Sequence, residues 1–130
     1  MSQSRTIAAN LTITGTIECD NLTTCDNLLS TSSIKIKRVS VSQNYTVLTT
    51  DFLVAVDTTN QSVTITLPDA STIDKHVIYI KDEGGYCSTN NITITTTNSQ
   101  LIDGQQSITM NVNYSSITLY NNGINKYFII

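Results

Sequence analysis

The segment 62–82 constrains the fold of this chain most strongly, because its apolar residues recur at every second position. In SVTITLP (62–68), valine, isoleucine and leucine alternate with threonine, and this period of two is typical of a β-strand with one buried face. Pro68 ends the strand, because proline has no N–H to give to a β-ladder. The run VIYI (77–80) is apolar on both faces, which predicts a second strand at the centre of a sheet or in an interface.

Alternating apolar runs continue along residues 34–130, and turn-prone dipeptides separate them. The further expected strands lie at 34–41, 45–48, 52–56, 92–94, 108–112, 117–119 and 127–130. Short strands at about ten-residue spacing predict an all-β fold with an antiparallel β-sandwich or jelly-roll-like head. The alternative is a parallel β-helix, with NITITTT (91–97), QLIDGQQSITM (100–110) and SSITLYNNG (115–123) as its rungs.

Residues 1–33 differ from the rest, because Asn-Leu pairs recur between short β-type runs. Each of these units has only one or two large apolar side chains, too few to order a single chain. Several copies wound together could cover one another's leucine and isoleucine. We therefore expect a β-rich oligomerising stem over 1–33 and a head over 34–130. The alternative for the first segment is a flexible tail.

Charged residues make up only 13% of the chain, and the net charge is −3, whereas a nucleic-acid-binding protein normally carries a basic face. The basic cluster consists of Lys35, Lys37 and Arg38. Its two lysines alternate with isoleucine, as on the solvated face of a strand. We therefore expect no nucleic-acid partner.

The N-terminus, MSQSRTIAANLTITG, lacks the apolar core of a secretory signal. No apolar run in the sequence approaches the ~20 residues of a membrane-spanning helix. We therefore expect synthesis in the cytoplasm and no membrane insertion.

The chain has three cysteines, Cys19, Cys25 and Cys87, and an odd number argues against a disulfide framework. The spacing of the first two does not match a zinc site, and His76 alone cannot complete one. We expect free structural thiols, with a disulfide between neighbouring chains as the alternative. No metal and no other cofactor is expected.

Acidic residues that could form a catalytic pair mostly stand beside turn signals, where aspartate is favoured for backbone reasons. They are Asp51, Asp57, Asp69, Asp74, Asp82, Glu83 and Asp103. No G-x-S-x-G nucleophile elbow accompanies the single histidine, and no loop follows the EF-hand calcium pattern. We therefore expect that the protein is not an enzyme.

An uncharged surface rich in threonine, asparagine and tyrosine suits the recognition of sugars, because rings stack on sugar faces and amides bond to hydroxyl groups. The turn DEGGY carries the candidate ligand-binding residues Tyr86, Asp82 and Glu83. Tyr114 and Tyr120 are weaker candidates, since cross-strand pairing explains their presence better.

Several motifs occur together in a recognisable order, namely YTVLTTDFLVAVD (45–57), SVTITLP (62–68), HVIYIKDEG (76–84), NITI (91–94), LIDG (101–104), SITM (107–110), SSITLYNNG (115–123) and KYFII (126–130). This order resembles the head domains at the ends of viral fibres, found on bacteriophage tail fibres and on surface proteins of large DNA viruses. The segment NLTITGTI resembles the β-rich shafts that precede such heads. Where the family commonly has a tryptophan after the last Asn-Gly turn, this chain has Tyr127 and Phe128.

The resemblance implies a viral structural protein, a homotrimer at the virion surface that contacts other virion proteins and a host glycan or receptor. Within such a trimer, segments 62–82 and 52–56 are the first candidates for the subunit interface. Two alternatives stay open at this point. One is a monomeric carbohydrate-binding or adhesin module, and the other is a fragment of a β-helical enzyme that degrades polysaccharides.

Overall fold

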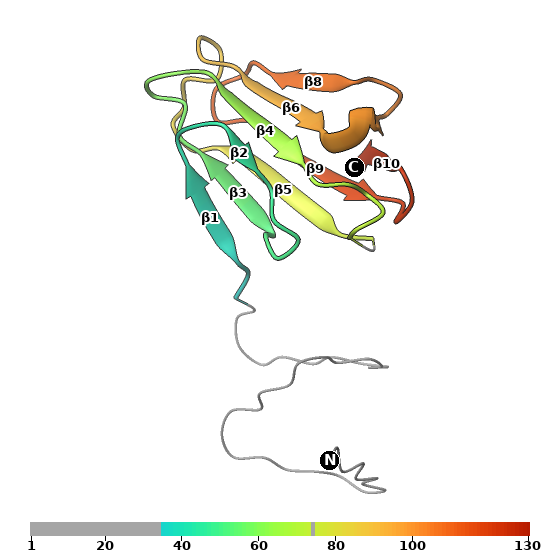
Figure 1. The fold of residues 1–130 in the computed structure, drawn as a ribbon. Coiled ribbons are helices and arrows are strands. Elements are labelled where there is room, and N and C mark those ends of the chain that lie inside the picture. Colours follow the sequence, from blue (N-terminus) through green and yellow to red (C-terminus); the bar gives the residue numbers. More distant parts are fainter. Residues whose placement is uncertain (1–34, 74) are drawn as a thin grey trace, which may run out of the picture. The chain divides into compact units, whose positions relative to one another are not determined.

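The computed structural model describes residues 35–73 and 75–130. The expectations for the stem over 1–33, for Cys19 and for Cys25 therefore lie outside the described residues. Residues Lys35–Ile130 form a compact unit (Figure 1). Its strands are β1 (Arg38–Val41), β2 (Tyr45–Thr46), β3 (Leu53–Val56), β4 (Val63–Leu67), β5 (Val77–Asp82), β6 (Ile92–Thr96), β7 (Leu101–Ile102), β8 (Ser107–Met110), β9 (Ser116–Asn121) and β10 (Lys126–Ile129).

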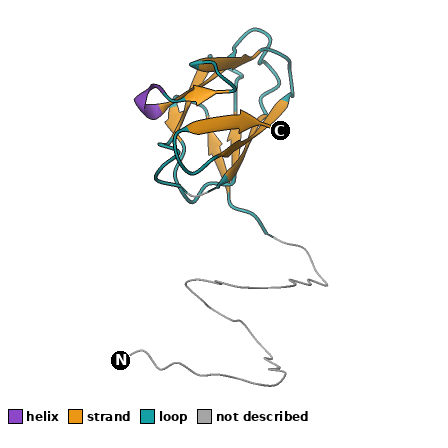
Figure 2. Ribbon diagram, turned by 90° about the vertical axis from the view of Figure 1, so that its right-hand side faces the viewer, coloured by secondary structure: helices purple, strands orange, loops and turns teal. Residues whose placement is uncertain are grey.

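The described residues contain no α-helix, and only one short 3₁₀ turn, η1 (Thr97–Ser99), interrupts the strands (Figure 2). The prediction of an all-β fold is therefore confirmed for the residues that the structure describes. The strands form two sheets. Sheet A has six strands in the order β1-β3-β5-β9-β10-β7, and sheet B has four in the order β2-β4-β6-β8.

The first six strands alternate between the two sheets. Strands β1, β3 and β5 lie parallel in sheet A, and β2, β4 and β6 lie parallel in sheet B. Each strand is therefore followed in sequence by a strand of the opposite sheet. The strand after that returns to the first sheet, so β3 lies beside β1 and β4 beside β2. This is the winding of a parallel β-helix, and it extends over residues 38–96.

The last strands reverse this pattern. Strand β9 is antiparallel to both β5 and β10, and β8 is antiparallel to β6, whereas β7 is parallel to β10. Both sheets are therefore mixed, and the expectation of purely antiparallel pairing is wrong for β1–β6. The expected β-helix rungs were also misplaced, because only 91–97 contains one of the strands β1–β6 that form the winding. Alternation marks a strand and its buried face, but it does not identify the strand's neighbour.

One apolar core lies between the sheets and draws on both of them. In β4 and β6 every second side chain is buried, and the two strands are in register with Ile65 opposite Ile94. From sheet A, Ile78 and Ile80 are also fully buried. Each such side chain contributes about 1.5–3 kcal/mol relative to exposure. The period of two in the sequence therefore does mark the core face.

A buried carboxylate holds the first turn of the winding in place. Asp51 Oδ2 accepts hydrogen bonds from the Tyr45 hydroxyl at 2.6 Å and from the Leu48 backbone N–H at 2.9 Å. Lys37 Nζ lies 3.0 Å from Asp51 Oδ1, in an ion pair that lacks the alignment of a hydrogen bond. These contacts join the chain before β1 to the segment between β2 and β3. Asp51 therefore has a structural position, as its turn-like sequence context predicts.

The outer faces of the two sheets differ in chemistry. The outward side chains of sheet B are hydroxyl groups arranged in rows across the strands, and no charged residue occurs in β2, β4, β6 or β8. These side chains are Thr46, Thr64, Thr66, Thr93, Thr95, Ser107 and Thr109. The outer face of sheet A instead carries large apolar side chains, and the register places those of neighbouring strands opposite one another.

The aromatic patch, as we call this part of sheet A, covers β3, β5, β9 and β10. Its members are Phe52, Leu53, Val77, Tyr79, Tyr120 and Phe128. The rings of Phe52 and Tyr79 have centroids 5.0 Å apart, and those of Tyr120 and Phe128 are 5.2 Å apart and stacked. Tyr79 is 38% exposed although Ile78 and Ile80 beside it are buried. The apolar second face predicted for VIYI is therefore present on the surface.

Replacement of Ile94 by alanine tests the assignment of the core face. We expect Ile94→Ala to lower the free energy of unfolding by about 2–5 kcal/mol, because it leaves a cavity between the sheets. Thr93→Ala, one residue away on the outer face, should cost less than about 1 kcal/mol. Urea denaturation of the full chain measures both changes. Equal losses in the two variants would contradict the register of β6.

Candidate functional site

Four loops meet at one end of the described unit. Strands β1, β3 and β5 are parallel and adjacent, so the loops that follow them begin at the same end of sheet A. These loops are 42–44, 57–62 and 83–91. The β8–β9 connection, 111–115, joins them because β9 is antiparallel to β5. In α/β and all-β proteins alike, loops gathered at one end of a rigid scaffold are the usual place for binding residues.

Asp82 ties three of these loops together. It is the last residue of β5 and is completely buried. Its carboxylate accepts four hydrogen bonds, from the hydroxyl of Thr58 at 2.7 Å and from the backbone N–H groups of Gly85 at 3.0 Å, Tyr114 at 2.9 Å and Cys87 at 3.3 Å. A buried acceptor shared by three loops fixes them relative to one another.

The carboxyl group of Asp82 has a pKa below its ordinary value. Burial alone raises the pKa, since it disfavours the charged form. The hydrogen bonds from Thr58, Tyr114, Gly85 and Cys87 outweigh burial and lower the pKa overall. Asp51 behaves in the same way: burial raises its pKa, but the bonds from Tyr45 and the Leu48 N–H, together with the Lys37 ammonium, lower it overall. Both aspartates are therefore ionised at neutral pH.

Two glycines let the β5–β6 loop approach its neighbours. A Cβ atom on Gly84 would collide with the backbone N of Thr58. A Cβ atom on Gly85 would collide with the ring of Tyr114, and Gly85 has a φ of 75°, in the left-handed region. The ring of Tyr114 therefore lies over Gly85, and this explains the Gly84-Gly85 pair as more than a turn signal.

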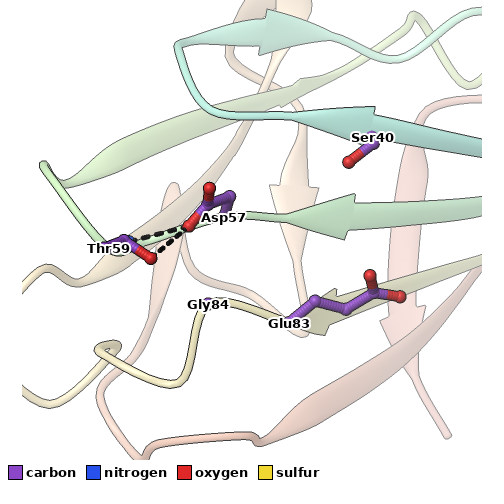
Figure 3. Close-up of a pocket in the computed structure, with 5 residues that line it drawn as sticks. All are labelled: Ser40, Asp57, Thr59, Glu83 and Gly84. Carbon is purple, nitrogen blue, oxygen red and sulfur yellow. Dashed lines mark hydrogen bonds between the residues drawn. The ribbon is translucent and has the colours of Figure 1, made fainter.

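An open hollow of about 320 Å³ lies beside Gly84 (Figure 3). Ser40 from β1, Asp57 and Thr59 from the β3–β4 loop, and Glu83 form the rest of its lining. Asp57 Oδ1 accepts hydrogen bonds from the Thr59 hydroxyl at 2.6 Å and the Thr59 N–H at 3.0 Å. These bonds lower the pKa of Asp57. The hollow therefore has an ionised carboxylate and two hydroxyl groups.

Glu83 stands at the edge of this hollow in a bidentate ion pair. Arg38 Nε donates to Glu83 Oε1 at 3.2 Å, and Arg38 Nη2 donates to the other oxygen. The hydrogen bond and the charge of Arg38 lower the pKa of Glu83. Both partners are exposed, so the pair stabilises the fold little. Its consequence for the site is that the charge of Glu83 is compensated locally.

A second hollow of about 330 Å³ adjoins the same β3–β4 loop and is lined by uncharged side chains, namely Gln43, Asn44, Gln61 and Ser62. Gln61 Nε2 donates to the carbonyl of Ser42 at 2.9 Å, and Asn44 Oδ1 accepts from the N–H of Thr64 at 2.8 Å. These bonds hold the β1–β2 and β3–β4 loops together. The amides that line the second hollow are thus partly fixed by the backbone.

The three residues proposed from the sequence occupy different positions. Asp82 is buried with both oxygens engaged, so in this structure it positions the loops and offers no atom to a ligand. Glu83 lines the hollow. Tyr86 is 51% exposed, and its N–H donates to the hydroxyl of Thr58 at 3.0 Å, which fixes it against the loop that carries Asp57.

Sequence reasoning did not propose Ser40, Asp57 or Thr59 as ligand-binding residues. The polar run that begins at Asp57 is visible in the sequence, but it lies far along the chain from Glu83. Only the parallel pairing of β1, β3 and β5 brings Ser40, the loop after β3 and the loop after β5 to one end of the sheet. Knowledge of that pairing would have identified the hollow.

Metal and thiol chemistry find little support in the part of the chain that the structure describes. Within residues 35–73 and 75–130, no three His, Cys, Asp or Glu side chains are grouped as metal ligands would be. Cys87 is a free thiol, buried in the core, and it donates to the carbonyl of Met110 at 2.9 Å. Burial raises the pKa of this thiol, which disfavours the reactive thiolate.

Over the same described ranges, no helix has the length and apolar character needed to cross a membrane. No protein-family model matches the chain, and no curated protein matches it either.

The ionised aspartates make stability depend on acid pH. Because the pKa of Asp82 and of Asp51 is lower in the folded than in the unfolded chain, their contribution is complete above about pH 4 and is lost as the pH falls further. We expect the free energy of unfolding to decrease below about pH 4 in urea titrations. Asp82→Asn should lower it by at least about 2 kcal/mol at pH 7, since buried donors lose their acceptor.

The same variant should also show a smaller decrease in acid, because one of the titrating groups is gone. Asp103→Asn makes the same chemical change at an exposed turn and should stay close to the unmodified protein at pH 7. A decrease in acid as large in Asp82→Asn as in the unmodified protein would show that Asp82 is not one of the responsible groups.

Proposed function

We propose that this chain is a non-enzymatic structural protein of a virus, the head of a trimeric fibre or surface spike that attaches the virion to a host surface. The observation that carries this proposal is the aromatic patch on the outer face of sheet A. The sequence motifs that resemble viral fibre heads supply the viral context. In this proposal the two mixed sheets are the layers of a sandwich-like head.

The aromatic patch has the composition of an interface core. It combines four aromatic and two aliphatic side chains, with Thr118 opposite Tyr79 within it and the charged Arg38 opposite Leu53 at its edge. Interface cores are enriched in tyrosine and phenylalanine and depleted of charge, and contiguous exposed apolar patches on soluble proteins mark interaction sites. Tyr79 and Leu53 belong to the segments that the sequence selects for a subunit interface. Contact with further copies would cover them.

The opposite face gives the contrast that a closed oligomer needs. The rows of threonine and serine on sheet B are polar and uncharged, and such a face is stable in water without a partner. The described unit begins at Lys35, immediately before β1, and β1 is the edge strand of sheet A.

Attachment to the host is assigned to the loop end. The loops there carry the exposed Tyr86 and Tyr114 and the two polar hollows. The buried Asp82 holds these loops in one arrangement, so a ligand would meet a preformed surface. The carboxylates of Asp69 and Asp82 each accept four hydrogen bonds from backbone and neighbouring side chains, which fits a structural role better than a hydrolytic one.

Light scattering on the purified full chain tests the oligomer. We expect a particle of three times the chain mass of 14.2 kDa. Tyr79→Glu should shift the protein toward monomer, because a charge would be buried in the interface. Thr93→Glu places the same charge on the outer face of sheet B and should leave the trimer intact. Circular dichroism checks that both variants are folded.

A monomer of the unmodified chain would contradict the fibre proposal and would favour the monomeric adhesin. A stable trimer of a folded Tyr79→Glu variant would instead place the subunit contact elsewhere on the molecule.

A further inference from the structure

The hollow beside Gly84 contains an oxygen atom that the folded unit leaves unused. The two hydrogen bonds to Asp57 both end on Oδ1. None of the described residues donates to Oδ2. An ionised carboxylate with a free oxygen in an open hollow is a strong acceptor for hydroxyl donors, because charge-assisted hydrogen bonds are about twice as strong as neutral ones. Figure 3 shows Asp57 with Thr59 on one side and Glu83 beyond Gly84 on the other.

The remaining polar groups of the hollow are both donors and acceptors. Ser40 and Thr59 contribute hydroxyl groups, which can accept from a ligand and donate to it. The Thr59 hydroxyl already donates to Asp57, so its lone pairs are free for a donor. A ligand that fits this set must itself carry several closely spaced hydroxyl groups. A sugar ring is such a ligand.

Two exposed tyrosines lie next to Gly85, the neighbour of the lining residue Gly84, although neither of them lines the hollow. Gly84 lines the hollow, the ring of Tyr114 lies over Gly85, and Tyr86 follows directly. Tyr114 and Tyr86 are 63% and 51% exposed. Both are anchored through the backbone, by the bonds of Tyr114 to Asp82 and of Tyr86 to Thr58. Their rings are apolar surfaces next to polar groups, which suits the mixed faces of a sugar.

The charge of the hollow selects among sugars. The charge of Glu83 is balanced by Arg38, but none of the described residues forms an ion pair with Asp57, and the buried carboxylate of Asp82 is near enough to act on Asp57 electrostatically. The hollow is therefore net negative. A sialylated, sulfated or uronic-acid ligand would be repelled, whereas a neutral sugar would not.

We propose that the hollow lined by Ser40, Asp57, Thr59, Glu83 and Gly84 binds one unit of a neutral glycan, with Tyr86, two residues after Gly84, as the candidate stacking ring. The neighbouring hollow is lined mainly by amides, shares the β3–β4 loop and has no charged residue among its lining. It accommodates a further neutral sugar unit of the same glycan. This inference rests on the proposed attachment function for the source of the glycan. The geometry of the hollow does not depend on the oligomeric state.

An array of immobilised glycans, probed with the full chain, tests the ligand class. The array presents neutral glycans that end in galactose, glucose, mannose, fucose or N-acetylglucosamine beside their sialylated and sulfated counterparts. We expect binding to at least one neutral glycan and at least about fivefold weaker binding to its acidic counterpart. Preference for the acidic glycans, or no binding to any neutral one, would overturn the proposal.

Variants then test the residues, with the best free saccharide titrated by NMR. Asp57→Asn keeps the acceptor for Thr59 but removes the charge, and it should weaken binding at least about tenfold. Asp103→Asn is the matched control and should bind like the unmodified protein. Tyr86→Ala should weaken binding about threefold to tenfold, and Tyr86→Phe, which keeps the ring, should bind within about twofold.

Unchanged binding in a folded Asp57→Asn variant would overturn the proposal, and so would binding that is abolished by a calcium chelator, since Asp57 would then hold a metal ion and not the sugar. Light scattering on the same samples keeps the two proposals separate. A trimer that binds no neutral glycan defeats only this inference, and a monomer that binds one through Asp57 defeats only the fibre.

Discussion

The fully buried carboxylate of Asp82 is the interaction on which the loop end of this protein depends. A charge in the core is costly unless hydrogen bonds compensate it, and here four donors from three loops do so. The donors also depend on the carboxylate, because buried N–H and hydroxyl groups without an acceptor would destabilise the fold. Gly84 and Gly85 make it possible, since side chains there would push the loops apart.

This network of hydrogen bonds around Asp82 forms because of the winding of the chain. Strands β1 to β6 alternate between two sheets in parallel ladders, so every second loop, namely those after β1, β3 and β5, lies at the same end of the unit. The antiparallel β8, β9 and β10 then complete both sheets. The two ends and two faces thereby acquire separate characters: polar loops at one end, hydroxyl rows on sheet B and the aromatic patch on sheet A. Attachment and assembly can therefore use different surfaces.

The sequence-based candidate site shares Glu83 with the hollow and lacks its other lining residues. The turn DEGGY does stand at the loop end, with Glu83 and Tyr86 on the surface. Asp82 has the same turn-like context as its neighbours, and nothing in that context reveals that it is buried. Asp57 was visible as a polar loop residue, but its proximity to Gly84 comes from a strand pairing between segments more than two dozen residues apart.

The sequence by itself determined that the described part of the chain is all-β and which face of each alternating strand is buried, because the period of two is a local property of an extended backbone. The burial of Ile65 and Ile94 followed directly from it. The pairing of the strands was decided only by the tertiary structure. Ladders between β-strands use backbone groups that every residue has, so a Thr/Ile strand carries almost no information about its partner. Packing of the whole core determined the parallel winding, and this winding gathers the loops that form the hollow at one end.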